Sequence, residues 1–482
     1  MNVTTALRAH AARAPQHIAF AGLPTPVLTY AALERAVDVV ATRLATLGLR
    51  AGDTAVLATR DTVRQLVAGL ALARLGVAQA GPSFPAAFVS MTLADDPAEV
   101  AAHPNVAPLA SVMADAFTAS AAPVPLHDDP DAILMHAPSS GTTGAVKHVP
   151  ITQALAQRRA ARRAAEVAGV PLREGQALRL ACHIGLQSTF GMGSVLHVLD
   201  RGGTLLAAEL DAARIASWLL HARVSYLVTS PIGLARMLDA LPAQRTANVL
   251  DAIEVGGAAL APAVLGQVRE RLGAVVFVGY GLTECGRVAG GDARRFADVP
   301  GAVGVPYPDV ELMIRDDAGA AVPDGQAGIV WVRSPRNATG YFADPVASAA
   351  VFQDGWVRTN DWGSVGDGGV LRILGRADDV INRDGVKIDP AWVERSLVAL
   401  GGIDEAAAFG VPHGGGVALC AAVVAKAAPF NLDAFHARCR RTLGTRAPDL
   451  LVQVQALPRN ANGKVERAAL VRLVQASPAA AR

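Results

Sequence analysis

The sequence predicts an α/β protein with a large N-terminal region of several subdomains, built of helix-covered sheets, and a small α+β C-terminal domain. The chain has 482 residues, of which 51% are apolar, and this exceeds what one ordinary core contains. Segments with helical spacing alternate with short β-branched runs, which is typical of parallel sheets covered by helices. Near Gly375 the pattern changes, and the segment that follows has about the size of a separate domain.

The segments that carry this pattern follow one another along the chain. Apolar residues recur every three or four positions over residues 30–47, which predicts a helix. Further helices are expected at 215–220, 390–400 and 432–443. Strands are expected at 132–135, 204–207, 224–228, 252–255, 275–278, 328–333, 356–358, 406–411 and 418–425. A Pro- and Ala-rich stretch, 119–130, is expected to be a surface connection. We therefore place the two domains at 1–375 and 376–482.

Composition argues against several classes of protein. The formal net charge is +2 and no long basic run occurs, which argues against a nucleic-acid partner. The most apolar stretch, 66–80, contains Arg74 and is too short to span a membrane, so no membrane insertion is expected. The N-terminus lacks the apolar segment of a signal peptide. Four cysteines lie far apart without metal-ligand spacing and are expected to be buried free thiols of a cytoplasmic protein: Cys182, Cys285, Cys420 and Cys439.

A loop rich in glycine and hydroxyl side chains follows the strand expected at 132–135. Its glycines let the backbone curl and present N–H groups to an anion, while the hydroxyls and a lysine add donors. This chemistry suits a polyphosphate, although the loop is not a Walker loop, because His148 follows Lys147. The alternative is a flexible surface turn. The residues that we expect to bind phosphate are Ser139, Ser140, Gly141, Thr142, Thr143, Gly144 and Lys147.

A Thr–Glu pair follows the strand expected at 275–278. Thr283 offers a hydroxyl to a phosphate, and Glu284 offers a carboxylate to Mg²⁺, which prefers oxygen ligands. Further along, Asp361 can accept the hydroxyls of a ribose, and Arg376 can donate to them. Small residues at Gly256, Gly257 and Ala258 would let a flat ring or an acyl group come close to the backbone. Solvated or tight turns are the alternative interpretation of each of these segments.

Taken in order, these segments resemble the signature segments of the adenylate-forming superfamily of acyl- and aryl-CoA synthetases, peptide-synthetase adenylation domains and luciferases. The resemblance spans nearly the whole chain. It implies that the chain binds ATP and Mg²⁺, that Thr283 contacts the α-phosphate, and that Glu284 holds the metal ion. It also implies that Asp361 and Arg376 bind the ribose. The residues that it places at or near the adenine are Gly256, Gly257, Ala258, Gly279, Tyr280 and Gly281.

The C-terminal segments resemble the mobile cap of the same superfamily. Asp378 matches the pivot of the cap, and Gly385 with Lys387 belongs to the loop that matches the lining of the thioester tunnel. Lys464 matches the catalytic lysine, which would swing in on a Gly-containing loop and neutralise charge on the reacting groups. ATP and Mg²⁺ are then expected at the junction of the two domains. Four positions depart from the family pattern: Val146, where proline is usual, His148 and Asn360, where glycine is usual, and Gln153, where histidine is often found.

The identity of the carboxylic acid substrate is the property that the sequence determines least. No aspartate stands between residues 180 and 190, where amino-acid-activating relatives usually hold the substrate ammonium. An α-amino acid is therefore disfavoured, and the residues around the expected pocket suggest a small, medium or aromatic acid. The expected lining residues are His183, Gln187, Ser188, Tyr226 and Ser230, together with Gly257.

The sequence thus predicts an AMP-forming acid–thiol ligase. A small-molecule carboxylic acid would be activated as its acyl-adenylate, and the thiol of CoA or of a phosphopantetheine arm would then take the acyl group. One alternative is a ligase that loads an acyl carrier protein. The other is a non-catalytic relative that only binds acyl groups or nucleotides. Against the latter stands the presence of Thr283, Glu284, Asp361, Arg376 and Lys464.

Overall fold

The structure of the chain is a computed structural model. It describes residues 1–22, 27–140, 146–167, 177–207, 216, 219, 222–242, 250–258, 260–316, 318–377, 380–383, 386–413, 416–459 and 465–475. The chain forms two compact units, Met1–Leu312 with Val332–Arg358 and Met313–Trp331 with Thr359–Arg482. The chain crosses from one unit to the other three times, each time within a strand. These strands are β16 (Glu311–Arg315), β17 (Gly328–Arg333) and β19 (Trp356–Val365). The sequence analysis placed a boundary between residues 375 and 376, where a mobile C-terminal cap domain was expected to begin. That boundary stays a prediction.

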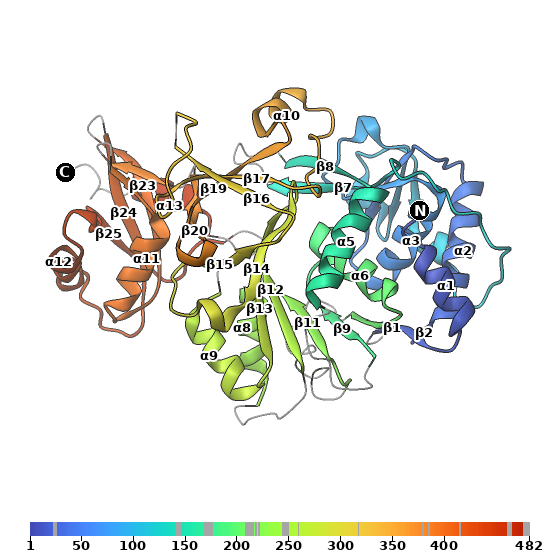
Figure 1. Cartoon of the computed structure of the whole chain (residues 1–482), viewed down its shortest axis with the longest axis horizontal. Coiled ribbons are helices and arrows are strands. Elements are labelled where there is room, and N and C mark those ends of the chain that lie inside the picture. Colours follow the sequence, from blue (N-terminus) through green and yellow to red (C-terminus); the bar gives the residue numbers. More distant parts are fainter. Residues whose placement is uncertain are drawn as a thin grey trace. The chain divides into compact units, whose positions relative to one another are not determined.

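The first unit contains a six-stranded, mostly parallel sheet (Figure 1). Its strands lie in the order β6-β5-β3-β4-β7-β8, in which β8 is antiparallel to β7 and the other pairs are parallel. Parallel order places the carboxyl ends of these strands at one edge. The strands are β3 (Thr54–Ala58), β4 (Ala78–Ala80), β5 (Met91–Ala94), β6 (Val106–Pro108), β7 (Ile133–Ser140) and β8 (Val146–Thr152).

A second sheet of the same unit has the order β2-β1-β10-β9-β11-β12-β13-β14-β15. The pairs from β1 to β13 are parallel, while β2, β14 and β15 are antiparallel to their neighbours. The strands are β1 (Ile18–Gly22), β2 (Leu28–Thr29), β9 (Arg179–Cys182), β10 (Thr204–Ala207), β11 (Tyr226–Thr229), β12 (Ala252–Gly256), β13 (Val275–Leu282), β14 (Gly286–Asp292) and β15 (Ala302–Pro306).

Helices cover the faces of both sheets. The pair α5 and α6 lies between them, because α5 contacts β7 and β8 while α6 contacts β9 and β10 (Figure 1). On the second sheet, α8 and α9 pack on β12 and β13. The described helices of this unit are α1 (Thr5–Arg13), α2 (Tyr30–Thr46), α3 (Thr62–Leu75), α4 (Leu109–Met113), α5 (Gln153–Val167), α6 (Thr189–Asp200), α8 (Pro231–Ala240), α9 (Pro262–Arg271) and α10 (Pro345–Val351), which is followed by the short strand β18 (Phe352–Gln353).

The arginine in the most apolar stretch of the sequence is completely buried. Arg74 lies near the end of α3 and donates hydrogen bonds of 2.6 Å to Asp38 and to Glu34 on the neighbouring helix α2. A buried charge is tolerated when it is paired in this way. Gly76, at φ +72°, then ends α3 in the left-handed conformation that suits glycine.

The second unit contains a small mixed sheet. β23 and β24 form a long antiparallel pair, and β25 is parallel to β24. Helix α11 packs on β23, and α12 packs on β25. Two further antiparallel pairs are β19–β20 and β21–β22. The elements are β20 (Leu371–Arg376), β21 (Ile381–Arg383), β22 (Val386–Ile388), α11 (Pro390–Ala399), β23 (Ile403–His413), β24 (Gly416–Ala425), α12 (Leu432–Leu443), β25 (Leu450–Val454) and α13 (Arg467–Gln475).

The structure confirms the predicted fold class and most of the predicted elements. The helix predicted at 30–47 is α2, and the helix at 432–443 and the strand at 328–333 have the predicted bounds. Several strands are longer than predicted: β7 runs on to Ser140, β13 to Leu282 and β19 to Val365, and β23 extends over Ile403–His413. The helix predicted at 215–220 falls largely outside the described residues. All four cysteines are free and buried, as predicted.

Helices long and apolar enough to cross a membrane are absent from the part of the chain that the structure describes.

Candidate functional site

The strand that leads into the predicted phosphate loop lies beside the strand that leaves it. In the β7–β8 pair, Ser139 lies opposite Lys147 and Ser140 lies opposite Val146. The two ends of the loop are therefore held next to each other by the sheet. Its tip lies outside the described residues, so the phosphate contacts expected there stay predictions for Gly141, Thr142, Thr143 and Gly144.

Glu284 lies against the strand that leads into this loop. Its Oε1 atom accepts a hydrogen bond of 2.5 Å from the Ser139 hydroxyl and one of 2.8 Å from the Tyr341 hydroxyl. The neighbouring Thr283 hydroxyl donates to the Pro138 carbonyl oxygen at 3.4 Å. Glu284 is 7% exposed. The structure thus brings together two predicted segments that are far apart in the sequence.

Tyr341 belongs to the same group of side chains, although the sequence analysis did not identify it. Its hydroxyl donates to Glu284, and the Lys147 ammonium lies 5.0 Å from the centre of its ring, within the range of a cation–π contact. Burial and the Glu284 carboxylate raise the pKa of Tyr341 far above its usual value, so the phenol remains a proton donor. No local signal marks this residue, because its partners come from distant segments.

Arg159 of α5 holds the turn that carries the Thr–Glu pair. Its guanidinium donates to the backbone carbonyls of Thr283 at 3.1 Å, of Glu284 at 3.2 Å and of Arg336 at 2.9 Å. Burial lowers the pKa of Arg159 to about 10, so the group stays charged at neutral pH. A side chain at Gly286, where φ is +68°, would lie 2.9 Å from the Arg159 Nε atom. The glycine therefore allows this arginine to reach the turn.

The donors at this place fit a magnesium ion that also binds phosphate. Mg²⁺ is usually held by one or two carboxylates together with phosphate oxygens and waters. Glu284 provides such a carboxylate, and the two hydroxyls bonded to it are neutral, so they do not cancel its charge. Within the described residues, no group of three or more His, Cys, Asp or Glu side chains could hold a metal ion.

The glycines predicted at the adenine lie on neighbouring strands. Gly256 of β12 is paired with Gly279 of β13. Gly257 has φ +87° with open space at its Cβ position, and it is exposed together with Ala258. Gly281 allows a close approach of strands, because a Cβ atom there would overlap the Gly286 carbonyl oxygen. Tyr280, between these glycines on β13, is half-buried.

The residues predicted at the ribose are paired within the second unit. Asp361 and Arg376 lie opposite each other in the β19–β20 pair, and Arg376 Nη1 donates to Asp361 Oδ1 at 2.9 Å. Lys387 lies on β22, opposite Asn382. The predicted pivot, tunnel glycine and catalytic lysine, namely Asp378, Gly385 and Lys464, lie outside the described residues.

Most of the residues predicted to line the acid pocket have structural partners. The hydroxyls of Ser188 and Ser230 accept from backbone N–H groups at the starts of α6 and α8. Gln187 donates to the Leu57 carbonyl at 3.1 Å and so joins the two sheets. His183 Nδ1 lies 3.1 Å from the Thr229 hydroxyl. Tyr226 is 2% exposed and belongs to a buried ion cluster.

This ion cluster was not predicted from the sequence. Glu254 of β12 is 1% exposed, and its two carboxylate oxygens accept hydrogen bonds from the guanidiniums of Arg163 and Arg287. The Tyr226 hydroxyl donates to the same carboxylate at 3.1 Å. Burial alone would raise the pKa of Glu254, but the two arginines outweigh it and lower the pKa. The available signal was a charged residue inside the otherwise apolar strand at 252–255.

Two departures from the family pattern have structural explanations. The Gln153 amide is buried, accepts from the Val3 backbone N–H at 2.8 Å and donates to the Ala73 carbonyl at 3.0 Å. His148 is also buried, and its ring lies edge-on to Phe84. Both side chains thus have partners in the packed interior of the first unit.

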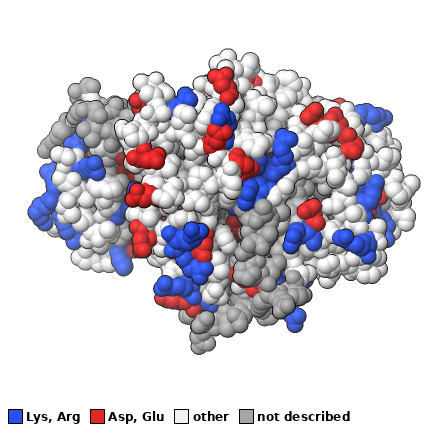
Figure 2. All heavy atoms as spheres, in the orientation of Figure 1, with Lys and Arg blue, Asp and Glu red and all other residues white. Residues whose placement is uncertain are grey.

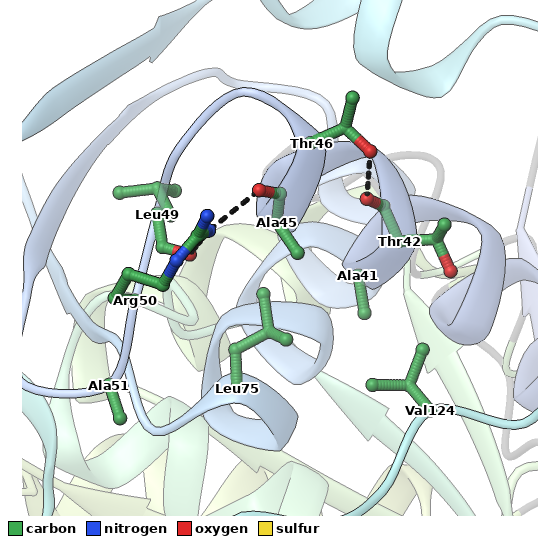
Figure 3. A pocket seen from close by; sticks show the side chains of 9 residues that line it. All are labelled: Ala41, Thr42, Ala45, Thr46, Leu49, Arg50, Ala51, Leu75 and Val124. Atoms are coloured by element: carbon green, nitrogen blue, oxygen red, sulfur yellow. Dashed lines mark hydrogen bonds between the residues drawn. The ribbon is translucent and has the colours of Figure 1, made fainter.

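A surface hollow of about 580 Å³ lies elsewhere, on α2 and the end of α3 (Figure 3). Its walls are mostly small apolar side chains, and Thr46 and Arg50 donate to backbone carbonyls of α2. None of the predicted site residues lines it. Figure 2 shows acidic and basic side chains interspersed over the described surface of one face, in keeping with the small net charge.

Solved structures share this fold over nearly the whole chain. O-succinylbenzoate coenzyme A synthetase from Bacillus subtilis, in complex with AMP, has a TM-score of 0.85 at 23% identity, and the match covers 96% of this chain and 97% of that chain. An amide bond synthetase from Marinactinospora thermotolerans has a TM-score of 0.84 at 26% identity, with 98% and 99% covered. The chain therefore has the fold of these two enzymes.

Two family models match this chain, one over its N-terminal part and one over its C-terminal part. The model of AMP-binding enzymes matches residues 7–342, and the model of the AMP-binding enzyme C-terminal domain matches residues 392–464. The chain belongs to the family of AMP-binding enzymes, which confirms the resemblance seen in the sequence.

Curated relatives match over shorter stretches. A long-chain-fatty-acid–CoA ligase from Yersinia pestis is 32% identical over 214 residues, which are 44% of this chain and 38% of the ligase. A fatty acid–acyl-carrier-protein ligase from Mycobacterium marinum is 30% identical over 60% of this chain and 58% of the ligase. The matches thus cover less than two thirds of either relative's length.

Proposed function

We propose that the chain uses ATP and Mg²⁺ to activate a carboxylic acid and then passes the acyl group to a thiol. In the first step a carboxylate oxygen attacks the α-phosphorus of ATP, and the bond from that phosphorus to pyrophosphate breaks. In the second step a thiol loses its proton, its sulfur attacks the acyl carbon, and AMP leaves. The product is a thioester, and the enzyme would be an AMP-forming acid–thiol ligase.

The observation that carries this proposal is the hydrogen bond between Ser139 and Glu284. It joins residues that are 145 positions apart. One belongs to the segment that has the chemistry to bind a polyphosphate, and the other offers a carboxylate to a hard cation. A metal ion that neutralises phosphate charge needs both kinds of group at one place. Membership in the family of AMP-binding enzymes supports the same interpretation.

Within this proposal, catalysis is positioning and charge neutralisation. Thr283 and Lys147 hold the phosphates, while Asp361 and Arg376 bind the ribose. Glu284 would hold Mg²⁺, which when bound would supply positive charge to the phosphate oxygens. Lys464 of the second unit supplies a further positive charge to the α-phosphate as the carboxylate attacks. The proposal needs no protein nucleophile.

The thiol acceptor is CoA or a phosphopantetheine arm of an acyl carrier protein. The curated relatives include a CoA ligase and a carrier-protein ligase, so their names support both acceptors. An amine is a further acceptor to test, because the amide bond synthetase resembles this chain over nearly its whole length. We place the reaction in the cytoplasm, where free cysteines persist as thiols.

Acid-dependent exchange of labelled pyrophosphate into ATP tests the first step. With purified protein and Mg²⁺, we expect exchange with some members of a library of carboxylic acids. Acids that support exchange are then incubated with CoA, a phosphopantetheine carrier protein or simple amines, and the products are identified by mass spectrometry. Folded protein that exchanges pyrophosphate with none of the acids would contradict the proposed function and favour a non-catalytic binding protein.

A further inference from the structure

Residues 338–342 connect two of the predicted site segments, and we call them the bridging segment. At one end, the Ala338 N–H donates to the backbone carbonyl of Glu284 at 2.7 Å. At the other end, the Phe342 N–H donates to the backbone carbonyl of His148 at 2.7 Å. The latter residue belongs to β8, the strand that leaves the predicted phosphate loop. The bridging segment therefore ties the turn with the Thr–Glu pair to this strand through backbone hydrogen bonds alone.

Tyr341 of the bridging segment lies between two opposite charges. The Lys147 ammonium lies over the face of its ring, 5.0 Å from the ring centre, and its hydroxyl donates to Glu284 Oε1 at 2.8 Å. The Tyr341 backbone N–H donates to the Ser348 hydroxyl at 2.8 Å, and the Phe352 ring packs edge-on with 5.2 Å between the ring centres. The backbone and the ring packing thus fix the place of this phenol.

The two charges beside Tyr341 do not pair with each other. Within the described part of the chain, no ion pair joins the Lys147 ammonium to the Glu284 carboxylate, although both contact the same phenol. Opposite charges attract more strongly where water is excluded, and Glu284 is only 7% exposed. The phenol itself adds no charge, because burial and the carboxylate raise the pKa of Tyr341. A neutral group therefore occupies the place between the two charged groups.

We propose that Tyr341 is a positioning residue that holds Lys147 and Glu284 apart, so that the ammonium can bind the phosphates of ATP and the carboxylate can bind Mg²⁺. The proposal rests on the proposed function, in which these two side chains have those roles. It gives separate tasks to the two parts of the phenol, since the ring holds the ammonium and the hydroxyl orients the carboxylate. Without the ring, the two charges would form an ion pair that ATP has to break.

Calorimetric titration with ATP, in the presence of EDTA and without any acid, tests the task of the ring. For Tyr341→Leu, which removes the ring, we expect Kd for ATP to rise by about 3- to 30-fold, the range of one cation–π contact or one exposed to half-buried ion pair. Tyr341→Phe keeps the ring and should stay within about twofold of the wild-type Kd. Its defect should instead be in the Mg²⁺ dependence of pyrophosphate exchange.

A second change in the Tyr341→Leu protein separates the proposed ion pair from a general loss of structure. Adding Glu284→Gln should recover most of the lost affinity for ATP, because it removes the charge that would capture Lys147. The same change in the wild-type protein should improve Kd for ATP by a smaller factor, because no such pair exists there. A merely structural role of Tyr341 would not produce this recovery.

Phe342→Leu is the matched control. It removes the neighbouring ring of the bridging segment, which packs on Phe84 and Phe88 instead of on the two charges, and Kd for ATP should not change. Circular dichroism checks that each variant folds, and Tyr341→Met replaces Tyr341→Leu if the latter does not.

Any of four results would overturn the proposal. They are a wild-type Kd in Tyr341→Leu, an equal loss in Tyr341→Phe, an equal loss in Phe342→Leu, or a gain from Glu284→Gln that is the same with and without the ring. Wild-type protein that binds ATP neither in EDTA nor with Mg²⁺ would instead contradict the proposed function.

Discussion

Two nearly buried glutamates of the first unit, Glu254 and Glu284, have opposite kinds of partner. Glu254 is held by the guanidiniums of Arg163 and Arg287, whereas Glu284 is held by the hydroxyls of Ser139 and Tyr341. Arginine approaches Glu284 as well, but Arg159 donates to the backbone carbonyl of this residue. Among the described residues, the hydrogen-bond partners of the carboxylate are therefore charged at one place and neutral at the other.

The difference shows which of the two carboxylates can bind a cation. A carboxylate between two guanidiniums already has its counter-charges, and a metal ion would have to displace them. A carboxylate bonded to neutral hydroxyls gains no counter-charge from them, and Mg²⁺ is a hard cation that prefers such an oxygen ligand. We therefore expect loss of Glu254 to affect stability and loss of Glu284 to affect the reaction.

The largest effect on stability is expected from Glu254→Gln. This change leaves two nearly buried guanidiniums without their carboxylate, which typically costs about 3–5 kcal/mol in the free energy of unfolding. Denaturation by urea, followed by circular dichroism, measures the loss. The triple change of Glu254→Leu, Arg163→Met and Arg287→Met should recover most of it, because it removes the charges together. A loss below about 1 kcal/mol would show that the ion cluster does not stabilise the fold.

The pH dependence of stability provides a second measurement on the same residue. The folded-state pKa of Glu254 lies below its usual value of 4.5, so the unfolded chain binds a proton at higher pH than the folded protein does. The contribution of Glu254 is therefore complete above about pH 4.5 and is lost as the pH falls through the folded-state pKa. The difference in stability between wild type and Glu254→Gln should shrink over that range.

Glu284→Gln should affect the reaction more than the fold. The amide oxygen can still accept from both hydroxyls, but the charge that attracts Mg²⁺ is gone. We expect pyrophosphate exchange to slow by about a hundredfold, with a higher Mg²⁺ concentration needed for half of the maximal rate. Titration of Mg²⁺ in the exchange assay measures both quantities. A wild-type rate at limiting Mg²⁺ would remove Glu284 from the metal site.

The smallest effect is expected from Tyr341→Phe, which removes one of the two hydroxyls that orient Glu284. One such hydrogen bond contributes about 0.5–1.5 kcal/mol. Its loss should raise the Mg²⁺ concentration needed for half-maximal exchange by about 2- to 12-fold. Tyr30→Phe is the matched control, because the Tyr30 hydroxyl donates to the Gly203 carbonyl at 2.8 Å. The control should lower stability and leave the Mg²⁺ dependence unchanged. If Tyr341→Phe and Tyr30→Phe change the Mg²⁺ dependence equally, Tyr341 has no specific role in orienting Glu284.

The sequence predicts what depends on local pattern and misses what depends on distant contacts. The strand at 275–278 and the helix at 432–443 were recognisable because hydrophobic pattern is a local signal. Tyr341 could not be recognised, because its role depends on a contact with Glu284, 57 residues away. Tyr226 was predicted to line a pocket, and its residue type alone does not reveal that its hydroxyl is bonded to Glu254.

Two paired glycines of the second sheet, Gly279 of β13 and Gly290 of β14, differ in how much change they tolerate. Any side chain larger than hydrogen at Gly290 meets the Tyr307 hydroxyl, and one at Gly279 presses on Arg287. A Cβ atom at Gly290 would also lie 2.9 Å from the Val278 carbonyl oxygen, so a larger residue there is harmful, whereas the group met at Gly279 is the flexible end of the Arg287 side chain. Libraries that vary Gly290 alone should therefore return mostly unfolded clones, whereas libraries that vary Gly279 alone should return folded ones.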